Sequence, residues 1–133
     1  MRYLLDTNII SALVRQPGGV VTQHIREVGE NNVATSVIVA AELRYGVAKK
    51  GSARLAAQLE LILAALPLLP FEPPADAIYG DLRAELERAG RSIGGNDLLI
   101  AAHALSSNCI LVTDNQREFE RVKALRLEYW LRA

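Results

Sequence analysis

Apolar residues recur along this chain in two patterns. Short apolar runs bounded by polar or turn residues are typical of buried strands, and they occur at residues 2–5, 32–35, 68–71, 109–112 and 125–130. Longer segments repeat apolar residues every three or four positions, as on one helix face, and begin near residues 8, 20, 37, 52, 74 and 97. This alternation predicts an α/β fold, with helices on both faces of a central, mostly parallel five-stranded sheet.

Capping and turn residues separate these segments. Ser36 is placed to cap the third helix, which Gly51 is placed to end. The segment Gly-Gly-Asn at 94–96 predicts a loop that ends in a helix cap, followed by a helix from Asp97 to about Ser106. We expect the two glycines to give the chain room beside Asp97.

Acidic residues follow two of the predicted strands. Asp6 comes directly after the first strand, and Asp114 follows the strand at 109–112. In open parallel sheets, ligand sites form at the carboxyl ends of the strands, near the point where the strand order reverses. We therefore expect both carboxylates at one edge of the sheet.

Two further acids lie on helices among apolar residues. Glu42 follows the segment VIVAA, and Asp97 precedes the segment LLIAA. A carboxylate in such a helix is costly to bury unless it is paired, protonated or bound to a cation. No lysine or arginine lies one helical turn from Asp97, and none near Glu42 has the spacing that favours an ion pair on the same face.

Each acid taken singly also has a structural interpretation. Asp6 can cap the helix that follows it, and Asp114 is an ordinary turn residue. Asp97 lies in the first turn of a helix, where the helix dipole favours a negative charge by about 0.3–1 kcal/mol. Separate capping roles give no reason for the acids to gather at one edge of a sheet, so their joint placement favours a site.

Gathered carboxylates would constrain the chemistry of such a site. Several carboxylates within a few ångströms repel one another and cannot all stay ionised without a cation. Ligands that are all oxygen favour Mg²⁺ or Mn²⁺ over Zn²⁺. A magnesium ion with a few carboxylates and waters can activate water and neutralise charge on phosphoryl oxygens. The residues thus predict metal-dependent phosphate chemistry.

Composition narrows the class of protein. The 133 residues fit one domain, 1–133. Fifteen Lys and Arg balance fifteen Asp and Glu, so a nucleic-acid function has to come from a local site. Cys109 is the only cysteine, which excludes an internal disulfide, and we expect a cytoplasmic location. The apolar runs fall short of the ~20 residues that span a bilayer, so no membrane association is expected.

The chain contains four short motifs, LDTN at 5–8, AELRYG at 41–46, GNDLLIAAHA at 95–104 and VTDNQREF at 112–119. These motifs resemble those of PIN-domain ribonucleases, and in particular of the VapC toxins of bacterial type II VapBC toxin–antitoxin systems. The resemblance extends almost from end to end, including LEYW at 127–130. One motif alone would be a weak signal, but four in this order at this spacing are a specific one.

This resemblance implies a PIN-like domain and a magnesium-dependent endoribonuclease that cuts structured RNA such as tRNA or rRNA. It also implies inhibition by a cognate VapB-type antitoxin, and a homodimer. By motif position, Asp6, Glu42 and Asp97 match the main catalytic acids of the family, with Asp6 and Asp97 its usual metal-binding pair. Glu42 is expected to orient the water or to bind a second ion.

The fourth acidic position departs from the family pattern. Many members carry their last acid two residues after the threonine, where this chain has Asn115. Asp114 is the adjacent acid, so either Asp114 or the amide of Asn115 is expected to complete the rim of the site. The number of metal ions stays open. The alternatives to a ribonuclease are a metal-dependent DNA nuclease on the same site and a non-catalytic nucleic-acid-binding module.

Overall fold

The structure is a computed structural model, and it describes residues 2–132. In chain order the elements are β1 (Arg2–Leu5), α1 (Thr7–Arg15), α2 (Val20–Val28), the 3₁₀ helix η1 (Glu30–Asn32), β2 (Val33–Ser36), α3 (Val37–Lys50), α4 (Ala53–Ala65), β3 (Leu68–Leu69), α5 (Ala75–Arg88), α6 (Gly95–Ser106), β4 (Cys109–Val112), α7 (Gln116–Phe119) and β5 (Leu127–Glu128).

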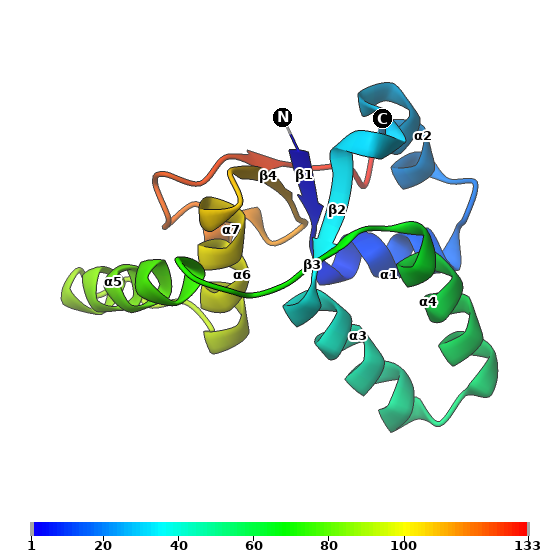
Figure 1. Cartoon of the computed structure of the whole chain (residues 1–133), viewed down its shortest axis with the longest axis horizontal. Coiled ribbons are helices and arrows are strands. Elements are labelled where there is room, and N and C mark those ends of the chain that lie inside the picture. Colours follow the sequence, from blue (N-terminus) through cyan, green and yellow to red (C-terminus); the bar gives the residue numbers. More distant parts are fainter. Residues whose placement is uncertain (1, 133) are drawn as a thin grey trace.

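The five strands form one sheet in the order β3-β2-β1-β4-β5, and every neighbouring pair is parallel. The predicted α/β fold is therefore confirmed, with a sheet that is parallel throughout. Helices α1 to α4 gather on one side of the molecule in Figure 1, and α5 and α6 lie on the other. From the central strand β1 the chain moves outward to β2, and later returns on the opposite side to β4. The strand order thus reverses at β1, which makes its carboxyl end the expected place for a site.

Helix α6 is the most deeply embedded of the helices that carry a predicted acid. Leu98 and the run from Ile100 to Ala104 are buried, as the apolar character of this segment on nearly all sides predicts. Against it packs α5, whose Leu86 is also buried. Burial of α6 fixes its first turn, which carries Asp97, relative to the sheet.

The predicted start of α6 was wrong. The helix begins at Gly95 with Gly94 as its N-cap, and no side chain caps it. Asn96 is not the cap, because it lies within the first turn of the helix; its amide nitrogen donates to Glu42 at 3.1 Å. A Cβ atom at Gly94 would meet nothing closer than 3.9 Å, and one at Gly95 would meet nothing within 4 Å. The expectation that the two glycines give the chain room beside Asp97 was therefore wrong, since a Cβ atom would fit at either position.

The predicted boundaries at the edges of the sheet were too generous. Strand β3 has two residues in place of 68–71, and β5 has two in place of 125–130. Edge strands pair on one side only, so fewer of their residues are held by ladder hydrogen bonds. At the β5 edge part of the apolar run is buried without strand pairing: Trp130 lies outside the strand and stacks on His24 of α2, with ring centroids 5.2 Å apart. The short helices η1 and α7 were not predicted, because three or four residues are too few to show a helical period.

The predicted caps of α3 are confirmed. Ser36 Oγ accepts a hydrogen bond from the backbone N–H of Ile38 at 2.9 Å, and Gly51 ends the helix with a φ of +69°. The cap therefore fixes where the helix that carries Glu42 begins.

Within residues 2–132 no helix is long and apolar enough to cross a membrane.

Candidate active site

Asp6 lies at the carboxyl end of the central strand. Its backbone N–H donates to the carbonyl of Val112 at 2.9 Å, which joins the ends of β1 and β4. One carboxylate oxygen accepts from the N–H of Thr7 and the other from the hydroxyl of Thr113, both at 2.7 Å. The first of these bonds caps α1, so the structural role considered for Asp6 is present. Both oxygens are held in place by donors, which orients the carboxylate.

The pKa of Asp6 is raised above its ordinary value. The side chain is only 6% exposed, and this burial is the largest cause. The hydrogen bonds from Thr113 and Thr7 oppose the shift, whereas the negative charges of Glu42 and Asp114 increase it. The carboxylates of Glu42 and Asp114 are thus close enough to Asp6 for their charges to repel its carboxylate.

Glu42 projects from α3 and is held by two polar side chains. Its Oε1 accepts from the hydroxyl of Thr7 at 3.1 Å, and its Oε2 accepts from the amide of Asn96, also at 3.1 Å. These bonds link α3 to the first turns of α1 and α6. Glu42 is partly exposed, so its carboxylate lies at the mouth of the site and can reach solvent.

Asp97 is the most strongly perturbed acid of the group. Burial first, and then the charges of Asp6 and Glu118, raise its pKa to about 7. A hydrogen bond with Glu118 and the charge of Glu42 are smaller contributions to the same shift. Asp6, Glu42, Asp97 and Glu118 are therefore gathered at the edge where the strand order reverses.

Glu118 is the acid that sequence reasoning missed. It lies on the short helix α7, and its Oε1 accepts from the N–H of Gly94 at 2.9 Å. Hydrogen bonds from Asn115 and Gly94 are the main causes that lower its pKa. Glu118 falls within the fourth motif. The helix that brings it near Asp97 has only four residues, which is too short to show a helical repeat of apolar residues in the sequence. The signal that was available is its position one helical turn after Asp114.

The two candidates for the fourth acidic position behave differently. Asn115 Nδ2 donates to Asp97 Oδ2 at 3.2 Å and to Glu118 Oε2 at 3.0 Å, so the amide links two carboxylates. Asp114 is exposed and accepts from the side chain of Asn8 at 2.9 Å. Asp114 thus lies at the margin of the group, close enough to raise the pKa of Asp6. A role of either residue in catalysis or metal binding stays a prediction.

A positive charge acts on these carboxylates from a distance: Arg121 contributes to the lowered pKa of Glu118 without a close ion pair. Over residues 2–132 no Lys, Arg or His forms an ion pair within 4.0 Å of Asp6, Glu42, Asp97 or Glu118. In the same range no three Asp, Glu, His or Cys side chains are placed so that they alone could hold a metal ion. The group is thus unlike the closed ligand cage of a structural zinc site. It fits Mg²⁺, which binds through one or two carboxylates and keeps several waters.

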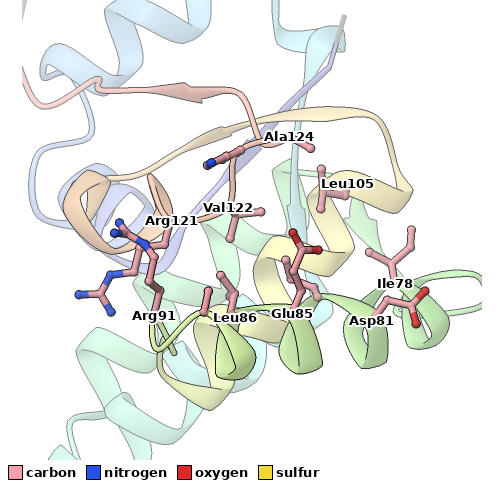
Figure 2. A pocket seen from close by; sticks show the side chains of 12 residues that line it. Ile78, Asp81, Glu85, Leu86, Arg91, Leu105, Arg121, Val122 and Ala124 are labelled. Carbon is pink, nitrogen blue, oxygen red and sulfur yellow. The ribbon is translucent and has the colours of Figure 1, made fainter.

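Three cavities help to locate the site. Two of them, of about 280 Å³ and 520 Å³, both have Thr7 and Glu42 in their walls. The third, of about 440 Å³, lies between α5 and the segment after α7 (Figure 2). None of the gathered acids lines this third cavity, whose charged residues include Asp81 and Arg121. The carboxylate site therefore opens towards the first two cavities.

Comparison with known proteins agrees with this geometry. Residues 3–125 match the family model of the PIN domain. The chain is 42% identical over 132 residues to Ribonuclease VapC2 of Rickettsia felis, and 35% identical over 131 residues to the tRNA(fMet)-specific endonuclease VapC of Shigella flexneri. Each alignment covers 98% of both proteins. The crystal structure of VapBC2 from Rickettsia felis, bound to a DNA fragment from their promoter, contains a chain with a TM-score of 0.90 and 40% identity, over 98% of this chain and 99% of that one.

The chain therefore belongs to the PIN-domain family, and its class is that of a nuclease. More narrowly, it belongs with the VapC ribonucleases. The recognition made from the four sequence motifs is thus confirmed.

Proposed function

We propose that this protein is a magnesium-dependent endoribonuclease, the toxin of a toxin–antitoxin pair, that hydrolyses phosphodiester bonds in structured RNA. The observation that carries the proposal is the group of carboxylates around Asp97, in which the pKa values of Asp6 and Asp97 are raised and no member forms an ion pair with a cationic side chain within residues 2–132. Carboxylates this close together cannot all stay ionised without a cation. In addition, two relatives of the chain are named as a ribonuclease and an endonuclease.

We assign Asp6 and Asp97 to hold the divalent ion. This ion is Mg²⁺, and Mn²⁺ can take its place. When bound, the ion supplies a more acidic water and neutralises charge on the phosphoryl oxygens. Thr7 and Thr113 fix the carboxylate of Asp6 through the hydrogen bonds described above. Glu42, at the mouth of the site, accepts a hydrogen bond from the attacking water and orients it in line with the phosphodiester. Either Asp114 or the amide of Asn115 completes the rim.

We further propose that the substrate is a tRNA or rRNA. A relative that is 35% identical over nearly its whole length is named a tRNA(fMet)-specific endonuclease. This relationship favours RNA over the DNA-nuclease and binding-module alternatives. The fold does not by itself distinguish these functions.

The proposed partners are a VapB-type antitoxin and a second copy of the chain, in the cytoplasm. The structural neighbour from Rickettsia felis is a complex of VapB and VapC type.

The test is cleavage of total cellular RNA by purified protein free of antitoxin, with Mg²⁺ or with EDTA. Asp97→Asn and Asp6→Asn should each abolish cleavage without unfolding the protein. Asp81→Asn is the matched control, because Asp81 lines the third cavity, and it should cut at the normal rate. Discrete fragments that need Mg²⁺ and both acids would support the proposal. Intact RNA from folded, metal-binding protein would overturn it, and preferential cutting of DNA in competition would replace it with the DNA-nuclease alternative.

A further inference from the structure

Helix α3 presents two stripes of residues to the two cavities that meet at Glu42. Ile38 and Tyr45 lie one helical turn before and after the adjacent pair Ala41 and Glu42, and all four residues line the 520 Å³ cavity. On the adjacent stripe, the cavity of about 280 Å³ is lined by Leu43, Gly46, Val47 and Lys50. Because both cavities share Glu42 and Thr7, a ligand that reaches from one to the other must pass the carboxylate site.

The larger cavity has the character of a nucleobase site. Tyr45 is 66% exposed, and it lies one helical turn from Glu42 in the same wall. Leu99 of α6 and Ile38 add apolar surface. Asn96 uses its amide nitrogen to hold Glu42, which leaves its Oδ1 available to accept from a base. The volume is within the range of about 300–1,000 Å³ that is usual for small-ligand pockets.

The smaller cavity has the character of a phosphate site. Arg15 lies on α1 two helical turns after Thr7, and Lys50 ends α3; both line the cavity. Neither side chain forms an ion pair with an acid within residues 2–132. Arg44, by contrast, is held by Glu60 through two hydrogen bonds of 3.0 and 2.9 Å. Arg15 and Lys50 are therefore the cations beside Glu42 that stay available for an anion.

We propose that a single strand of RNA crosses the site along this path, with a nucleobase stacked on Tyr45 and a backbone phosphate bound by Arg15 and Lys50. The proposal rests on the proposed ribonuclease function and names the subsites that bind on either side of the scissile bond. An aromatic platform and free cations on opposite sides of the carboxylate site match the alternation of base and phosphate in an unpaired strand. Arg15 and Lys50 also offset the repulsion between the substrate and the acids.

The base subsite is tested with Tyr45→Ala, Tyr45→Phe and the control Leu61→Ala, which removes an exposed apolar side chain that lines neither cavity. With a short RNA that the wild-type protein cleaves, Tyr45→Ala should raise KM about 5- to 100-fold, since base stacking on an aromatic ring has this effect. Tyr45→Phe should restore KM, because the ring and not the hydroxyl makes the platform. Leu61→Ala should leave KM unchanged.

A direct readout uses the cleavage-inactive Asp97→Asn background. RNA that carries 2-aminopurine at the nucleotide next to the cleavage site should lose fluorescence on binding, and Tyr45→Ala should abolish that quenching. RNA that is abasic at the same nucleotide should bind Asp97→Asn and Asp97→Asn/Tyr45→Ala equally well, because the base and the ring form one interaction.

The phosphate subsite is tested through the salt dependence of binding in the same background. Replacing both Arg15 and Lys50 with Gln should reduce the slope of log affinity against log salt by about 0.7, since the two side chains neutralise one phosphate and each neutralised phosphate on a single strand contributes about 0.7. The control Lys49→Gln removes a charge from the same helix end that lines neither cavity, and should change the slope by less than about 0.3.

The outcomes separate this proposal from the proposed function. RNA left intact by the wild-type protein would count against the ribonuclease itself. Cleavage by the wild-type protein with unchanged KM, quenching and salt slope in the variants would overturn the strand path alone. If Tyr45→Ala weakened only the binding of antitoxin, the cavity would belong to a protein partner, and the base subsite would also be overturned.

Discussion

At the scale of single residues, the carboxyl group of Asp97 lies where ionisation is unfavourable. Its pKa is about 7 in the folded protein, against 3.8 for an unperturbed aspartate. The folded state therefore binds this proton more tightly than the unfolded chain does. By linkage, the contribution of Asp97 to stability is fully present below pH 4 and is lost as the pH rises through about 7.

This leads to a prediction for the protein without metal. At pH 8 in EDTA, Asp97→Asn should be more stable than the wild-type protein by about 1–3 kcal/mol, because the amide cannot ionise. At pH 4 the two proteins should have nearly equal stability. Urea unfolding at both pH values measures the difference. A variant that is less stable than the wild type at pH 8 would show that the carboxylate is not strained by its neighbours.

Asn115 is a second residue whose change separates charge from hydrogen bonding. Asn115→Asp adds a negative charge beside Asp97 and Glu118, and it restores the acid that many family members carry at this position. We expect about 3- to 10-fold tighter binding of Mn²⁺, measured by calorimetry, and a lower Tm in EDTA at neutral pH. Asn115→Ala, which loses the hydrogen bonds without adding charge, should not bind Mn²⁺ more tightly. Equal affinities in all three proteins would remove Asn115 from the rim of the metal site.

At the scale of elements, the start of α3 is joined to the last turn of α6 through one hydrogen-bonded pair. Ser36 Oγ lies 2.7 Å from Nδ1 of His103 while it caps α3. His103 is 1% exposed, and burial lowers its pKa, so the ring is neutral near pH 7. The edge of the Phe71 ring packs against it, with centroids 5.5 Å apart. This pair sets the spacing between the helices that carry Glu42 and Asp97.

Removal of the Ser36 hydroxyl should lower the free energy of unfolding by more than removal of a helix cap alone, because it also breaks the hydrogen bond to His103. Ser36→Ala should lower the free energy of unfolding by about 2–3 kcal/mol, because it loses the cap and leaves a buried imidazole nitrogen without its partner. Ser52→Ala is the matched control, since Ser52 caps α4 through the N–H of Leu55 and has no histidine partner. Its cost should be about 1 kcal/mol. Equal losses in urea unfolding would show that the bond to His103 adds nothing.

At the scale of the whole molecule, the topology concentrates negative charge in a protein whose total charge is zero. The carboxyl end of β1 carries Asp6, the loop after β4 carries Asp114 and the start of α6 carries Asp97. A cation that binds there binds the folded state and not the unfolded chain. It should therefore stabilise the entire fold by mass action.

We expect Mg²⁺ at about 100 times its Kd to stabilise the wild-type protein by about 2.7 kcal/mol relative to EDTA, and to raise Tm by several degrees. The double variant Asp6→Asn/Asp97→Asn should show no such increase, whereas Asp81→Asn should behave as the wild type. Thermal melts with and without Mg²⁺ measure this. An equal Mg²⁺ effect on the double variant would place the ion elsewhere.

Much of this molecule can be predicted from its sequence, because the relevant physics is local. Hydrophobic periodicity and capping residues predict the strands and long helices, and the four motifs predict the family and the acids Asp6, Glu42 and Asp97. The limits of the edge strands, the true cap of α6 and the helix α7 were missed. They depend on which backbone groups find partners across the fold, and apolar patterning does not report that.

Only the tertiary structure decided how the polar side chains around these acids are used. Asn96 lies inside α6 and donates to Glu42, Asn115 donates to two carboxylates, and Glu118 reaches the group from a four-residue helix. The same holds for the two cavities that meet at Glu42, whose walls come from α1, α3 and α6. The sequence by itself determined which residues can supply charge and which segments are buried. Contacts between residues that are distant in sequence, such as Asp6 and Thr113, form only when the sheet assembles. Electrostatic coupling and hydrogen bonding depend on separation in space, so the sequence alone does not determine them.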